Sequence, residues 1–211
     1  MLTTIRRGGV TMSIILLSIV SAQDVSLQSE GVTPYRTLRY ASVIGQTSDF
    51  TCGPAALATM LTHYYGRPVS EQTLTKRSMA DMQARGKEVV EGITLLSLRN
   101  ALNTESIPSA GYKLTLEQLR GVLNAELPVV ANVVYPKGHY YLVLAVDDQN
   151  VLLADPSWGV RSQPIQNFLN AWNGVVLMPQ PSEAEAALAR VQVKQQLSKY
   201  RERIERLKTG A

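Results

Sequence analysis

The sequence predicts an α+β fold in which helices come first and an antiparallel sheet follows. A hydrophobic fraction of 45% and a charged fraction of 18% over 211 residues are typical of one folded domain. Residues 52–65 are rich in Ala, Leu and Met, which indicates a helix, whereas residues 129–154 hold three short runs dense in Val, Leu and Tyr. Two halves with different patterns therefore follow each other along the chain.

The first residues resemble a secretory signal peptide, which we place at 1–22. Arg6 and Arg7 supply a positive start, residues 12–20 an apolar run, and residues 20–22 a small-residue cleavage site. The apolar run is about nine residues long, well below the roughly 20 that a membrane-spanning helix needs. We expect export to the periplasm, with secretion or a retained membrane anchor as alternatives. Membrane contact is expected only through this segment, if it is not cleaved.

A polar linker is expected at residues 23–33, ahead of a domain that we place at 34–180. The first long helix of this domain is predicted to begin at Cys52 and to stop before Gly66. Residues suited to cap a helix N-terminus precede three further helical segments, and the last of them has Gln118 three positions later, as in a capping box. These predicted caps are Ser70, Thr94 and Thr115.

The second half of the domain is predicted to form strands, because turn residues separate runs rich in β-branched and aromatic side chains. The runs cover residues 129–134, 139–146 and 151–154. A short helix at 165–172 and a last strand at 174–178 complete the predicted layout.

The tail at residues 183–211 is predicted to form a basic amphipathic helix. Its apolar residues recur at spacings of four and three over fewer than three heptads, which is too short to indicate a coiled coil. The helix is expected either to pack on the domain or to dock on a partner in an envelope secretion system. The residues of this stripe are Val193, Leu197, Tyr200, Ile204 and Leu207.

The distribution of charge gives no indication of nucleic-acid binding. The chain has a net charge of +4, but the tail carries +3 and the first 22 residues carry +2. The main domain is therefore nearly neutral, and no nucleic-acid partner is expected.

The chain contains a single cysteine, so it cannot form an intramolecular disulfide although export is predicted. A free cysteine is either an inert buried side chain or a reactive one. At a helix N-terminus the sulfur of Cys52 would lie near unpaired N–H groups and the positive end of the helix dipole, which favour the thiolate. Gly53 is expected to let a substrate backbone approach, and Pro54 suits the first helical turn. Cys52 is thus the candidate nucleophile.

Two histidines could serve as its base. His63 lies 11 residues along the same helix, about 16 Å away at 1.5 Å per residue, and cannot reach Cys52. His139, at the start of a predicted strand, is the candidate base, with a structural histidine as the alternative. Asp155 ends the next strand before Pro156 and is the candidate to orient the imidazole; the alternative is an aspartate that only initiates a turn.

The hairpin between the two strands decides whether His139 and Asp155 meet. Side chains alternate between the faces of a sheet with period two, and both residues are odd-numbered. A regular two-residue turn at residues 148–149 would send them to opposite faces. We therefore predict an odd-length or bulged hairpin, with His139 between Asp155 and Cys52.

The order of residues resembles the C39 family of papain-like cysteine peptidases, the double-glycine leader peptidase type. The resemblance covers about residues 43–178 and rests on Gln46, Cys52-Gly53-Pro54-Ala55-Ala56-Leu57, Gly66, Leu127-Pro128, Gly138-His139-Tyr140, Ala154-Asp155-Pro156-Ser157, Phe168, Trp172 and Gly174.

The resemblance implies a papain-like fold with a defined role for each of four side chains. Cys52 would be the nucleophile, His139 the base, Asp155 its orienter and Gln46 a donor to the oxyanion, with no cofactor and no metal. Gln46 enters only through the resemblance, because the residues alone would make it an ordinary loop position.

The implied function is a cysteine peptidase that cleaves exported protein or peptide substrates through an acyl-thioester at Cys52. An apparent export signal and the lack of transporter segments make the chain similar to stand-alone C39-like envelope proteins, which serve secretion, bacteriocin or functional-amyloid assembly. One alternative is a non-catalytic C39-like peptide-binding module of a secretion system, against which the presence of Cys52, His139 and Asp155 together argues. Another is a transferase of the same fold, in which an amine takes the acyl group. Cleavage after Gly-Gly stays open.

Overall fold

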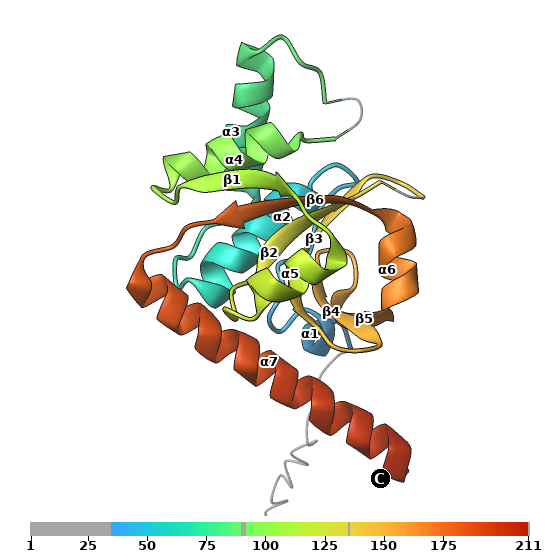
Figure 1. Cartoon of the computed structure of the whole chain (residues 1–211). Coiled ribbons are helices and arrows are strands. Elements are labelled where there is room, and N and C mark those ends of the chain that lie inside the picture. Colours follow the sequence, from blue (N-terminus) through green and yellow to red (C-terminus); the bar gives the residue numbers. More distant parts are fainter. Residues whose placement is uncertain (1–34, 90–91, 135, 211) are drawn as a thin grey trace, which may run out of the picture. The chain divides into compact units, whose positions relative to one another are not determined.

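A six-stranded antiparallel sheet lies between two groups of helices in the computed structural model (Figure 1). The structure describes residues 35–89, 92–134 and 136–210, so the predicted signal peptide and linker lie outside the described residues. The strands run in the order β1-β6-β2-β3-β4-β5 across the sheet. Their bounds are Ser109–Lys113 (β1), Val129–Val133 (β2), His139–Val146 (β3), Asn150–Asp155 (β4), Gly159–Pro164 (β5) and Trp172–Pro179 (β6).

The helices begin where the sequence places their caps. The hydroxyls of Ser70, Thr94 and Thr115 each accept a hydrogen bond from a backbone N–H in the first turn, which confirms all three. The helix predicted from Cys52 is also present and continues as a π-helical turn, η1. The described helices are α1 (Tyr35–Arg39), α2 (Cys52–Thr59), η1 (Met60–Tyr64), α3 (Glu71–Ala84), α4 (Leu95–Thr104), α5 (Leu116–Leu123), α6 (Ile165–Ala171) and α7 (Glu183–Thr209).

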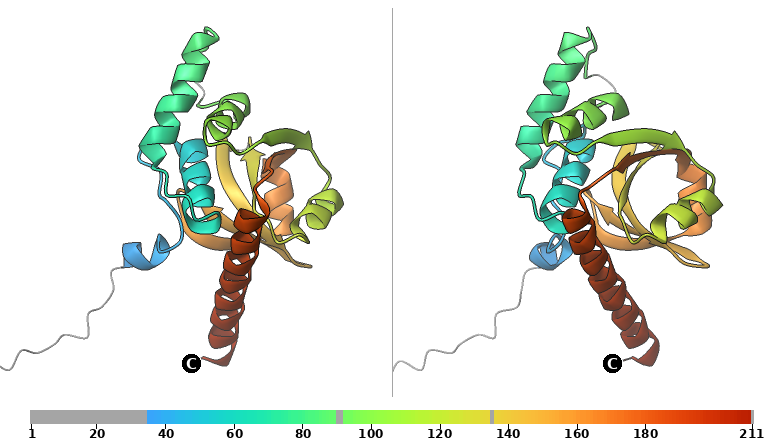
Figure 2. Two further views of the ribbon diagram at one scale, coloured as in Figure 1. Left: turned by 90° about the vertical axis from the view of Figure 1, so that its left-hand side faces the viewer. Right: turned by 60° about the vertical axis from the view of Figure 1, so that its left-hand side comes forward.

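Each face of the sheet is covered by its own hydrophobic core, as the two views of Figure 2 help to follow. Because strand side chains alternate, Val130 and Leu142 pack among α2, η1, α3, α4 and α7, whereas Ala131 and Val143 pack against α5 and α6. Burial on both faces explains why the central strands read as continuous apolar runs.

The strands β1 and β5 and the short helix α1 were not predicted from the sequence. The edge strands β1 and β5 are polar or mostly half-exposed, so they carry little of the apolar pattern that marked the others. Strand β1 belongs to the half expected to be helical and pairs with β6 from the other half. The expected order of helices first and sheet second is therefore wrong in this detail, although the α+β class is correct.

The first part of α7 belongs to the core of the domain. Ala186, Ala189 and Val193 are buried, and the latter two lie in the core that holds α2 and η1. Leu197 and Tyr200 pack against that core with part of their surface exposed. Within the described ranges, no helix combines the length and the apolar character needed to cross a membrane.

Candidate active site

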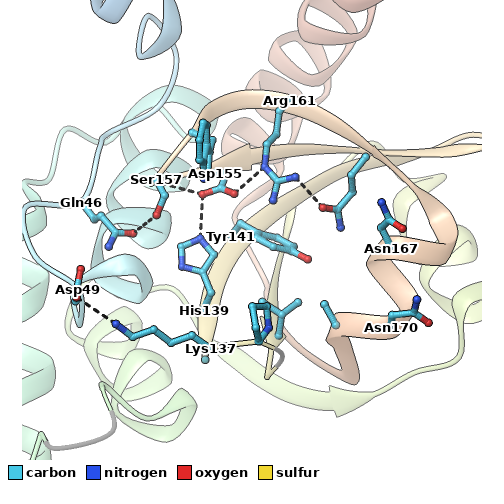
Figure 3. Close-up of a pocket in the computed structure, with 16 residues that line it drawn as sticks. Gln46, Asp49, Lys137, His139, Tyr141, Asp155, Ser157, Arg161, Asn167 and Asn170 are labelled. Carbon is cyan, nitrogen blue, oxygen red and sulfur yellow. Dashed lines mark hydrogen bonds and ion pairs between the residues drawn. The ribbon is translucent and has the colours of Figure 1, made fainter.

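His139 and Asp155 are hydrogen-bonded across neighbouring strands, with His139 Nε2 2.9 Å from Asp155 Oδ1 (Figure 3). The β3–β4 hairpin has a two-residue turn, because the N–H of Asp147 donates to the carbonyl of Asn150. A bulge between Val143 and Ala145 then inserts one extra residue into β3 and shifts the register. The predicted bulged hairpin is confirmed, and the bulge brings both side chains to one face.

Asp155 is a buried carboxylate whose two oxygens are fully engaged. Its side chain is 1% exposed and accepts hydrogen bonds from His139, from the backbone N–H of Ser157 at 2.8 Å and from Nε of Arg161 at 2.8 Å. Burial alone would raise the pKa of Asp155, but these partners outweigh it and hold the pKa below its ordinary value. Asp155 therefore stays ionised and fixes the orientation of the imidazole.

The imidazole of His139 is surrounded by groups that stabilise its protonated form. Burial acts against the charge, but the hydrogen-bonded carboxylate of Asp155 and the neighbouring Cys52 together raise the pKa of His139 to about 9. Since Nε2 faces Asp155, the other ring nitrogen, Nδ1, is the one left for the thiol of Cys52. His63, by contrast, lies in η1, where burial lowers its pKa.

Cys52 is the first residue of α2 and is 5% exposed. Every residue of α2 is buried, so the helix start is held firmly against its surroundings. A Cβ built at Gly53 would lie 2.7 Å from Leu98 Cδ1 and 3.2 Å from Tyr140 Cδ2. The expectation that Gly53 leaves room for a substrate backbone is thus wrong: this space holds α4 and β3, and the missing side chain lets α2 approach both.

Gln46 connects the loop before α2 to the turn that follows Asp155. Its backbone N–H donates to the carbonyl of Pro156 at 3.1 Å, and its Oε1 accepts from Ser157 Oγ at 2.7 Å. Its Nε2 donates to the carbonyl of Ser48 at 2.9 Å. An amide nitrogen carries two hydrogens, so one remains for a substrate oxygen. The role of Gln46 at an oxyanion stays a prediction.

Sequence reasoning missed the residues that support this arrangement. Arg161 and Ser157 hold Asp155, and Glu71, which is 4% exposed, accepts from the backbone N–H of Thr47 at 2.8 Å. Glu71 thereby anchors the loop between Gln46 and Cys52. No pattern in the sequence marks Glu71, because an acid in the first turn of a helix is common for the helix dipole alone, and only the structure shows that this one is buried.

A cavity of about 570 Å³ opens next to His139. Asn167 and Asn170 of α6 lie across it from Gln46 in Figure 3, and Lys137, paired with Asp49 at 3.1 Å, lies at its margin. Amide side chains can donate and accept, which suits a peptide backbone. The arrangement combines an imidazole, a buried carboxylate and a cavity large enough for part of a peptide; the buried Cys52 is not among the residues that line this cavity.

Comparisons with known proteins agree with this geometry. The model of the peptidase C39 family matches residues 41–184. The probable functional amyloid protease FapD of Pseudomonas aeruginosa is 28% identical over 148 residues, which cover 69% of this chain and 63% of FapD. This chain thus spans less than two thirds of the length of that relative.

Solved structures share the fold. The peptidase domain of Streptococcus ComA superposes with a TM-score of 0.57 at 22% identity, covering 67% of this chain and 98% of that domain. A double glycine motif protease from an AMS/PCAT transporter, solved in complex with a leader peptide, gives a TM-score of 0.54 at 20% identity, covering 66% of this chain and 91% of that protein. Both confirm the predicted papain-like fold class.

Proposed function

The chain belongs to the peptidase C39 family, and from that premise we propose that it is a cysteine peptidase in which Cys52, His139 and Asp155 cleave peptide bonds. One observation carries the proposal: His139 is hydrogen-bonded to the buried Asp155 at 2.9 Å, and Cys52 is among the groups that raise the pKa of its imidazole. Such an arrangement of nucleophile, base and orienter supports acyl transfer on unrelated folds.

The reaction proceeds in two halves. The thiolate of Cys52 attacks the carbonyl carbon of the scissile peptide, and the C–N bond breaks as the imidazolium of His139 gives its proton to the leaving amine. This leaves an acyl-thioester at Cys52 and a neutral imidazole. His139 then takes a proton from water as the oxygen of that water attacks the thioester carbonyl. The C–S bond breaks and the carboxylic acid product leaves, which restores the thiolate of Cys52 and the imidazolium of His139.

The oxyanion formed in each half needs donors close to Cys52. We assign this role to the backbone N–H of Cys52 and to the side-chain amide of Gln46, which Ser157 orients. The loss of one such donor typically costs about 2.7 to 4 kcal/mol of transition-state stabilisation.

The substrate that we propose is an exported protein or peptide with small residues at the scissile bond. FapD is named as a functional amyloid protease, and the AMS/PCAT relative was solved with a leader peptide. We infer a role in a bacterial secretion or amyloid-assembly system. The pattern of basic, apolar and small residues in 1–22 supports a periplasmic location, which fractionation of the cell envelope would test.

The decisive experiment is mass spectrometry of candidate exported proteins incubated with purified protein. Cleavage is expected with the unaltered chain and is expected to be lost in Cys52→Ala and His139→Gln. His63→Gln is the matched control, because His63 lies in η1 and belongs to no part of the site. A covalent acyl adduct on Cys52 should appear at short times. Equal cleavage by Cys52→Ala would overturn the proposal, and amide products formed only with added amine would favour the transferase.

A further inference from the structure

A second cavity of about 630 Å³ lies between α1, the β4–β5 end of the sheet and the C-terminal half of α7. Figures 1 and 2 show α7 (red) passing near α1 (blue) at this end of the domain. We call this cavity the basic groove and define it by Arg39, Trp158, Arg161, Lys199, Tyr200 and Arg203.

The basic groove carries positive charge without a matching acid. Four of its lining residues are Lys or Arg, and none is Asp or Glu. Arg161 is neutralised by Asp155, but Arg39 donates to the carbonyls of Ser157 and Trp158, which leaves its charge in place. The remaining two cations come from α7.

These two cations, Lys199 and Arg203, are exposed, lie one helical turn apart and face the same cavity. Neither forms an ion pair with an acid among the described residues, whereas Arg190, Lys194 and Lys208 of the same helix each do. Within the described part of the chain, Arg201 and Arg206 of α7 are in no ion pair either, but they do not line the groove, so Lys199 and Arg203 are the unpaired cations of α7 that face this cavity.

The groove also offers an aromatic surface that is fixed in place. The side chain of Trp158 is 61% exposed, and the guanidinium of Arg39 lies 4.5 Å from the centre of its ring. Tyr200 lines the same cavity. Exposed aromatic side chains beside cations are typical of surfaces that bind polypeptides.

Trp158 and Arg161 line both the basic groove and the cavity at His139. A polypeptide lying in the candidate active site can therefore continue past Trp158 into the groove. This continuity favours a polypeptide over a nucleic acid or a membrane, which would bind without any connection to the catalytic residues.

The helix α7 lies almost wholly beyond the family match at 41–184, so the groove depends on a segment that the family model does not include.

We propose that the basic groove binds an acidic segment of the substrate, separate from the segment that is cleaved. The proposal takes the occupant to be a substrate and so rests on the proposed function. The charge of Arg39, Lys199 and Arg203 would attract Asp and Glu side chains, and Trp158 would contact the chain between them. The contacts lie near the surface, so added salt should weaken binding.

The test measures binding without catalysis. A fluorescein-labelled peptide rich in Glu is titrated with the full chain carrying Cys52→Ala, and anisotropy gives the dissociation constant. Lys199→Glu with Arg203→Glu should raise this constant about tenfold or more. Arg201→Glu with Arg206→Glu is the matched control, because it makes the same charge change on α7 outside the groove. The control should change binding by less than twofold.

Three results would overturn the proposal: no binding of the Glu-rich peptide, equal binding of a Gln-for-Glu version, or equal losses in the two double variants. Displacement of the peptide by anionic vesicles or RNA at much lower concentration would also overturn it, in favour of those partners.

A second measurement links the groove to cleavage. In the unaltered chain, kcat/KM should be higher for a substrate with an acidic extension than for the same substrate without it. In the Lys199/Arg203 variant this advantage should disappear, so that the two values of kcat/KM become equal. Failure of all cleavage would refute the peptidase but leave the binding result standing.

Discussion

Replacing Asp155 by Asn tests whether this carboxylate keeps His139 protonated. The pKa of His139 is raised from 6.5 to about 9 even though burial acts in the opposite direction. At about 1.4 kcal/mol per pKa unit, this elevation corresponds to roughly 3 kcal/mol in favour of the imidazolium, shared between Asp155 and Cys52. The amide of Asp155→Asn would keep the shape of the side chain but not its charge, so we expect the pKa of His139 to fall by at least one unit.

Nuclear magnetic resonance can follow this titration directly, because the chain has two histidines. His63 provides an internal reference: burial lowers its pKa, and its titration should not change in Asp155→Asn. Asp148→Asn is the matched control, since Asp148 is fully exposed in the hairpin turn and contacts Arg120 at 3.7 Å. An unchanged titration of His139 in Asp155→Asn would refute the assignment of Asp155 as its orienter.

The same pKa sets the sign of two pH dependences. Because folding raises the pKa of His139, its contribution to the free energy of unfolding is fully present below 6.5 and is lost as the pH rises through about 9. Peptidase activity that needs the imidazolium should likewise decline as the pH rises through about 9. In Asp155→Asn both declines should occur at lower pH.

Two further predictions concern the stability of the parts that position the site. Gly159→Ala should lower the free energy of unfolding by about 2 to 3 kcal/mol, because φ is +76° and a Cβ would collide with the carbonyl oxygen of Arg39. Gly86→Ala is the matched control: φ is +65°, but no atom lies within 4 Å of the added Cβ, so the free energy of unfolding should fall by only about 1 kcal/mol. Val193→Ala should cost about 2 kcal/mol because Val193 is 1% exposed, whereas Val191→Ala at 50% exposure should change stability by less than about 0.5 kcal/mol. Urea unfolding measures all four variants. Equal effects at the two glycines would contradict the close approach of α1 to β5, and equal effects at the two valines would mean that α7 is not part of the core.

The sequence was most informative where one residue type meets one physical requirement. Helix caps at Ser70, Thr94 and Thr115 could be located because a hydroxyl satisfies a backbone N–H that has no partner within the helix. The central strands could be located because burial on both faces demands continuous apolar runs. Strands β1 and β5 lie at the edges of the sheet, where this demand is absent, and their residues gave no such signal.

The candidate nucleophile and base could be inferred because the chain offers so few alternatives: one cysteine and two histidines. Their support could not be inferred. Arg161 is six residues beyond Asp155 on a polar edge strand, and Glu71 is 24 residues beyond Thr47 at the start of a helix. Neither spacing is a local pattern, so only the fold brings these pairs together.

The bulge in β3 shows how one inserted residue determines whether His139 and Asp155 lie on the same face of the sheet. The two-residue turn of the β3–β4 hairpin would by itself send these side chains to opposite faces, and one extra residue in β3 reverses that outcome. The sequence from Tyr141 to Val146 contains no glycine to mark a bulge. The bulge is matched by the packing: Leu144 is fully buried and Ala145 packs against the same core, so two successive residues lie on the side of α2. An apolar stretch of β3 thus brings His139 to the same face as Asp155, and the hydrogen bond to Asp155 then orients the imidazole.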